Sequence, residues 1–151
     1  MNRTCCRDAD WGPQGLRIPY PDVARLPEIV QKRRAGTPRN VVRMAAHASR
    51  MLFDAHGRLG YAVASPDVLD RRVRETAILR VAHLSGSRYA LHHHIPRARA
   101  AGPAQDELQA LAAADYARLD SLLAAVARFV DAVVVDVSPS DATLAQLPTG
   151  H

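Results

Sequence analysis

The fold is decided by residues 70–102, which read DRRVRETAILRVAHLSGSRYALHHHIPRARAAG. Apolar residues recur at three- and four-residue spacing through the first half, which predicts a helix over about 70–84. Ser85-Gly86-Ser87 ends that helix and supplies the N-cap of a second one. The second helix is predicted to run to Ala101, where Gly102-Pro103 closes it. The short break folds the two helices back on each other.

Two titratable residues occupy apolar faces of this predicted hairpin, Glu75 on the first helix and His94 on the second. Burying an unpaired carboxylate costs several kcal/mol, so Glu75 needs a partner. His94 is the one titratable group on a face of small residues, and the hairpin brings the two helices together. We therefore expect a Glu75–His94 pair, with a purely structural buried hydrogen bond as the alternative.

The rest of the chain is also predicted to be helical. Apolar periodicity indicates further helices over about 22–34, 38–60, 104–113 and 116–132, and a short one after Ser140. Residues 133–137 are rich in valine and are interpreted as a strained helix end rather than a strand. Residues 1–20 are predicted to form an irregular arm. The prediction is an all-α protein with a single helical domain over 21–151.

Composition narrows the classes of function. The chain has 151 residues and a net charge of +5, but its arginines are scattered and only 5% of residues are aromatic. We therefore expect no nucleic-acid binding. There is no run of about 18 apolar residues, so we expect no membrane span. The N-terminus lacks the apolar core of a signal peptide, which favours a cytoplasmic protein.

The histidines do not predict a metal site. Consecutive helical residues point about 100° apart, so His92-His93-His94 cannot all bind one ion. The other histidines share no ligand spacing with them. We expect neither a metal nor a cofactor.

The stretch 74–102 resembles the carboxymuconolactone decarboxylase-like family, an all-helical superfamily that includes the alkylhydroperoxidase AhpD. The resemblance extends back to residues 36–40 and 46–47 and forward through 106–108 to 140–143. It covers most of residues 20–145 and implies a helical bundle.

The peroxidase branch of this family carries a glutamate, then Cys-x-x-Cys, then a histidine three residues on. Glu75 and His94 match the glutamate and the histidine, whereas Ser87 and Ala90 stand at the two cysteine positions. Neither residue forms a disulfide, so we expect no thiol peroxidase chemistry at this site. Peroxidase activity would require Cys5 or Cys6, the only cysteines, to reach the site from the arm.

The resemblance implies acid–base chemistry on a small carboxylated or lactone-type molecule, with Glu75 orienting His94 and His94 moving a proton. Substrate binding is expected from Ser87, Tyr89 and Arg71. The anion-binding candidates are Arg71, Arg74, Arg80, Arg88 and Tyr89. The alternatives are an N-cap role for Ser87, a packing role for Tyr89, and solvated or helix-pairing charges at Arg71 and Arg74. For the whole protein the alternative is a non-catalytic oligomeric or ligand-binding module.

The family usually continues into one more amphipathic helix after the stretch that resembles 140–143, whereas this sequence ends at residue 151. We therefore expect a domain shortened at its C-terminus. An apolar face left open in this way would be covered by another subunit, which predicts a homo-oligomer.

Overall fold

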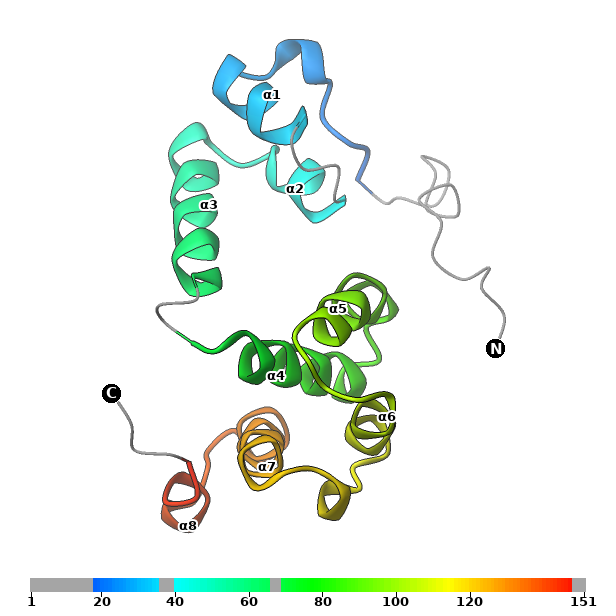
Figure 1. Cartoon of the computed structure of the whole chain (residues 1–151). Coiled ribbons are helices and arrows are strands. Elements are labelled where there is room, and N and C mark those ends of the chain that lie inside the picture. Colours follow the sequence, from blue (N-terminus) through cyan, green and yellow to red (C-terminus); the bar gives the residue numbers. More distant parts are fainter. Residues whose placement is uncertain (1–17, 36–39, 66–68, 148–151) are drawn as a thin grey trace. The chain divides into compact units, whose positions relative to one another are not determined.

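The computed structural model describes residues 18–35, 40–65 and 69–147, and every regular element in these ranges is a helix (Figure 1). The chain divides into two compact units, residues 1–68 and residues 69–151. Each unit is described by itself. Most of the predicted arm, with Cys5 and Cys6, lies outside the described residues, and the single domain over 21–151 stays a prediction.

The described part of the first unit holds a 3-10 turn and three helices: η3 (Val23–Arg25), α1 (Glu28–Ala35), α2 (Asn40–Ala45) and α3 (Arg50–Ala64). The predicted helix over 38–60 is therefore two helices. The second begins where the hydroxyl of Ser49 accepts a hydrogen bond from the backbone N–H of Leu52 at 3.3 Å, which caps α3. A small core of Val30, Ala46 and Phe53 holds the unit together.

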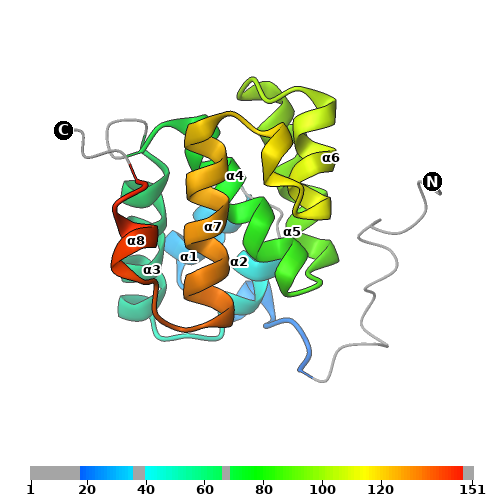
Figure 2. The same ribbon diagram turned by 90° about the horizontal axis from the view of Figure 1, so that it is seen from below.

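The second unit is built around one central helix. Its elements are α4 (Arg71–Leu84), α5 (Arg88–Ala100), α6 (Gln105–Ala113), η4 (Tyr116–Arg118), α7 (Ser121–Val135) and α8 (Asp141–Leu144). Helix α4 packs against α5, α6 and α7, and Figure 1 shows it between α5 and α7. Seen from below, α7 lies in front of α4 (Figure 2). The core of this unit contains Leu79, Ala98, Leu108, Leu111, Tyr116 and Ala127.

Helix ends follow the local sequence closely. Ser87 and Ser140 cap α5 and α8, as predicted, and Asp70 caps α4. The predicted helix over 116–132 is instead a 3-10 turn followed by α7, because Asp120 caps a new start by accepting from the N–H of Leu123 at 2.8 Å. Helix α7 continues through the valine run to Val135, so this run is a helix end, not a strand.

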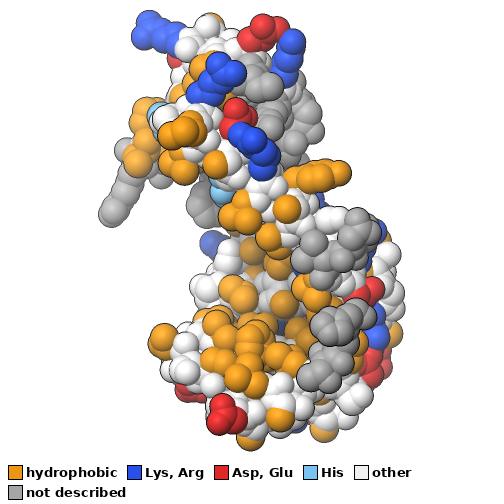
Figure 3. Space-filling view, turned by 90° about the vertical axis from the view of Figure 1, so that its left-hand side faces the viewer, with side chains coloured by type: hydrophobic (Ala, Val, Ile, Leu, Met, Phe, Trp, Pro, Cys, Tyr) orange, Lys and Arg blue, Asp and Glu red, His pale blue; other side chains and the backbone are white. Residues whose placement is uncertain are grey.

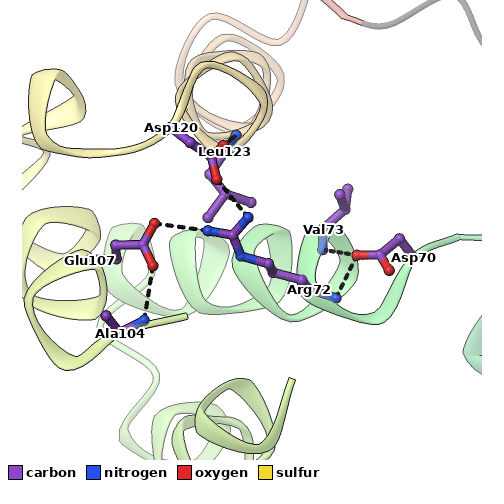
Figure 4. Close-up of polar contacts among 7 residues, drawn as sticks. All are labelled: Asp70, Arg72, Val73, Ala104, Glu107, Asp120 and Leu123. Atoms are coloured by element: carbon purple, nitrogen blue, oxygen red, sulfur yellow. Dashed lines mark hydrogen bonds and ion pairs between the residues drawn. The ribbon is translucent and has the colours of Figure 1, made fainter. Parts of the chain in front are cut away.

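The N-terminal ends of α4, α6 and α7 meet at Arg72 (Figure 4). Its guanidinium donates to Glu107 Oε1 at 2.8 Å and lies 2.6 Å from Asp120 Oδ2. Glu107 also accepts from the N–H of Ala104 at 2.8 Å. The hydrogen bond from the Leu123 N–H lowers the pKa of Asp120, burial opposes this, and Arg72 adds to the lowering. Arg72 thus links groups at the starts of all three helices.

Hydrophobic side chains also reach the surface of both units, and Figure 3 shows many of them on the face it draws. On α3, Met51, Leu52, Leu59 and Val63 are exposed, and at the end of α7 so are Val133, Val134 and Val135. Among the described helices, none has the length and hydropathy that a bilayer crossing requires.

Candidate functional site

The structure brings Glu75 and His94 into direct contact. Glu75 projects from α4 and His94 from α5, and His94 Nδ1 lies 2.7 Å from Glu75 Oε2. The side chain of Glu75 is 4% exposed and that of His94 is 19% exposed. The turn between the helices depends on Gly86, which adopts a φ of 64° that favours glycine. A nearly buried carboxylate therefore meets an imidazole that solvent still reaches.

This contact determines which ring nitrogen is available for chemistry. An ionised carboxylate only accepts hydrogen bonds, so the imidazole donates Nδ1–H to Glu75. In the neutral ring Nε2 then carries the lone pair. The arrangement suits proton transfer at Nε2, with Glu75 stabilising the protonated ring.

Arg74 lies beside the same carboxylate. Its Nε is 3.8 Å from Glu75 Oε1, and its side chain is 14% exposed. Glu75 thus has a cation near one oxygen and the imidazole on the other. This partnering offsets the cost of burying the charge.

Ser87 occupies the N-cap position of α5. Its hydroxyl oxygen accepts a hydrogen bond from the backbone N–H of Ala90 at 3.3 Å. The two positions that match the cysteines of the peroxidase branch are therefore linked by a capping bond. This geometry fits the structural alternative for Ser87, and a substrate contact stays a prediction.

Tyr89 and Arg71 differ in their placement relative to the pair. Tyr89 packs edge-on against the His93 ring, with the ring centroids 4.5 Å apart. Tyr89 and His94 are five positions apart, which places them about 140° apart around the helix. The position of Tyr89 thus fits a packing role. Arg71 is exposed at the start of α4, one turn before Glu75 and on the same side.

Arg80 does not join the anion-binding candidates, because a buried network occupies its guanidinium. Its Nε and Nη2 donate to the two oxygens of Asp131 at 2.5 and 3.1 Å, and Nη1 donates to the Leu111 carbonyl at 3.3 Å. The Tyr116 hydroxyl donates to Asp131 as well. Burial raises the pKa of Tyr116, and the hydrogen bond to Asp131 raises it further.

Nothing in the sequence indicated that Arg80 pairs with Asp131. Asp131 lies 51 positions away from Arg80, and no local spacing connects them.

His83, one turn after Arg80, is partly buried, and both burial and the nearby guanidinium lower its pKa. Within the described ranges, no group of three or more His, Cys, Asp or Glu residues is arranged to hold a metal ion.

Comparison with known families places this site in a wider context. The model of the carboxymuconolactone decarboxylase family matches residues 51–132, which is more than half of the chain and includes both Glu75 and His94. No curated protein and no solved structure gives a significant match. The extent of the family match shows that the chain belongs to the carboxymuconolactone decarboxylase family.

Proposed function

We propose that this protein is a small-molecule enzyme in which Glu75 and His94 act as an acid–base pair. The observation that carries the proposal is the 2.7 Å contact between the buried carboxylate and a partly exposed imidazole. A carboxylate that orients a histidine and stabilises its protonated form is a common arrangement for general acid–base catalysis. The substrate class, a small carboxylated or lactone-type molecule, rests on the family to which the chain belongs.

For a carboxylated lactone, the step is a decarboxylation with His94 as the acid. The bond from the ring to the carboxylate breaks, CO₂ leaves, and the electron pair delocalises into the lactone carbonyl. Protonated His94 then delivers its Nε2 proton to carbon and becomes neutral. Glu75 holds the imidazolium in place and stabilises its charge before the transfer. Arg71, at the exposed start of α4, is the proposed contact for a substrate carboxylate.

Thiol peroxidase chemistry is not proposed at this site. Ser87 and Ala90 stand where the peroxidase branch has its cysteines, and the Ser87 hydroxyl caps α5. A serine hydroxyl does not form the disulfide that such a cycle requires.

The proposal is tested by turnover. Carboxymuconolactone and a panel of small carboxylated lactones are offered to the wild-type protein, and CO₂ release is measured. We expect His94→Gln and Glu75→Gln each to lower kcat/KM by about 100-fold or more. The matched control is His92→Gln, which replaces an exposed histidine on the same helix and should retain turnover. Wild-type turnover in His94→Gln would sink the proposal.

The alternative is a non-catalytic oligomeric or ligand-binding module with the same fold. The exposed apolar side chains favour an assembly in either case. On α3, Met51, Leu52, Leu59 and Val63 fall on one side of the helix and are all exposed. We propose that a second copy of the chain covers such surfaces, giving a homo-oligomer. A monomeric mass in light scattering at micromolar concentration would contradict the homo-oligomer. The cytoplasmic location stays a prediction.

A further inference from the structure

The Glu75 carboxylate is approached on both of its oxygens. Oε2 is bonded to His94 Nδ1 at 2.7 Å, and Oε1 lies 3.8 Å from Arg74 Nε. Neighbouring residues of a helix point about 100° apart, so this approach requires the Arg74 side chain to turn around the helix toward Glu75. A long side chain that is only 14% exposed loses rotamer freedom in such a position. Holding Arg74 in this contact therefore costs side-chain conformational entropy.

The other three arginines of α4 do not take this place. Arg80 is bound to both oxygens of Asp131, and Arg72 contacts Glu107 and Asp120. Arg71 is exposed one turn earlier. Arg74 is thus the arginine that lies against the Glu75 carboxylate. A cation 3.8 Å from Oε1 attracts the carboxylate and restricts its rotation. A carboxylate fixed in this position accepts from Nδ1–H, whereas one that rotates away leaves both ring tautomers open.

We propose that Arg74 is a positioning residue that acts through Glu75 on His94. It holds the carboxylate so that the neutral His94 ring keeps its proton on Nδ1 and the protonated ring points its Nε2–H to the substrate side. The consequence for catalysis rests on the proposed function, whereas the effect on the ring tautomer does not. Arg74 itself touches neither substrate nor reacting atoms in this account.

The test reads the tautomer of His94 directly. In ¹⁵N-labelled full-length protein, the ring nitrogen shifts of His94 are assigned from the His94→Gln spectrum and recorded at a pH where the ring is neutral. We expect the Nδ1–H tautomer to dominate in the wild type. In Arg74→Gln we expect the share of the Nε2–H tautomer to rise at least about twofold. Arg71→Gln removes the same charge one turn away and should leave the ratio unchanged.

Two further variants keep the test decisive. Arg74→Met preserves the apolar stem in a half-buried position and carries the same expectation if Arg74→Gln folds poorly. Arg74→Lys restores a cation and should return the ratio toward wild type. An unchanged ratio in a folded Arg74→Gln or Arg74→Met protein overturns the proposal.

The catalytic consequence has its own readout. Arg74→Gln should lower kcat by about tenfold with little change in KM, because a misoriented general acid slows chemistry more than binding. If His94→Gln retains turnover while the tautomer ratio still depends on Arg74, the proposed function fails and the positioning role stands. If His94→Gln abolishes turnover while the ratio ignores Arg74, the positioning role fails alone.

Discussion

Helix α4 carries two buried polar clusters, and they differ in what they leave available. Glu75 and Arg80 are five residues apart, which places them about 140° apart around the helix, so one faces α5 and the other faces α7. In the Arg80 cluster the guanidinium, Asp131, Tyr116 and a backbone carbonyl bond to one another. In the Glu75 cluster the carboxylate is bonded to one nitrogen of His94, whose ring is 19% exposed.

We therefore interpret the Arg80 cluster as a structural network and the Glu75 cluster as a candidate site. The Arg80 side chain is 9% exposed and bonds to Asp131 and the Leu111 carbonyl, so breaking this network leaves a buried charge without compensation. In the Glu75 cluster the carboxylate contacts Nδ1 of a partly exposed imidazole, and Nε2 is the nitrogen that the proposed chemistry uses. We therefore expect substitutions on the α7 side to change mainly stability and those on the α5 side to change mainly activity.

The largest stability effect is expected from Asp131→Ala. It leaves the Arg80 guanidinium buried without its carboxylate, which should cost about 3 kcal/mol of unfolding free energy. Urea denaturation followed by circular dichroism measures this loss. A loss below about 1 kcal/mol would show that solvent or another group compensates Arg80.

Tyr116→Phe tests the same network more gently. It removes the hydroxyl that donates to Asp131 but keeps the ring, over which Arg80 and Arg128 lie at 5.3 and 5.2 Å. We expect a loss of about 1.5 kcal/mol, because a hydrogen bond to a charged group contributes more than a neutral one. In a double-mutant cycle with Asp131→Ala, the double variant should lose less unfolding free energy than the sum of the two single losses. A loss equal to that sum would show that the two groups act independently.

His94→Gln should cost less stability than either change. The glutamine amide can still donate to Glu75, and the position is partly exposed. We expect a loss of no more than about 1 kcal/mol in the same urea experiment. A loss as large as that of Asp131→Ala would break the comparison, since it would make the Glu75–His94 pair a structural element.

The smallest effect concerns pH and the Arg72 junction. The pKa of Asp120 is lowered in the folded state, mainly by the Leu123 N–H and also by Arg72. The stability it contributes is therefore present above its unfolded pKa and is lost as pH falls through the folded pKa. Asp120→Asn should flatten this acid-side loss in urea denaturation between about pH 5 and 3. An identical pH profile in the variant would contradict this role.

Local chemistry made most of the fold predictable. The break at Ser85-Gly86-Ser87 and the caps at Asp70, Ser87 and Ser140 lie within a few residues of the groups they bond. The break between α2 and α3 was missed, although Ser49 supplies a cap there, because the apolar spacing continues across it.

The candidate site was predictable only where one short turn brings its residues together. Glu75 and His94 are 19 positions apart and meet through a single hairpin. Arg80 and Asp131 are 51 apart, and Arg72 and Glu107 are 35 apart, so these contacts depend on how α6 and α7 pack on α4. Local spacing carries no information on such packing, and Arg80 was for this reason grouped with the anion-binding candidates.

One kinetic comparison tests the division between the two sides of α4 most directly. The kcat/KM for CO₂ release from a confirmed substrate is measured for His94→Gln and Tyr116→Phe in one buffer, with the folded fraction of each variant determined in parallel. The account predicts a loss of about 100-fold or more in His94→Gln and near wild-type turnover per folded molecule in Tyr116→Phe. Wild-type turnover in a folded His94→Gln protein would contradict it.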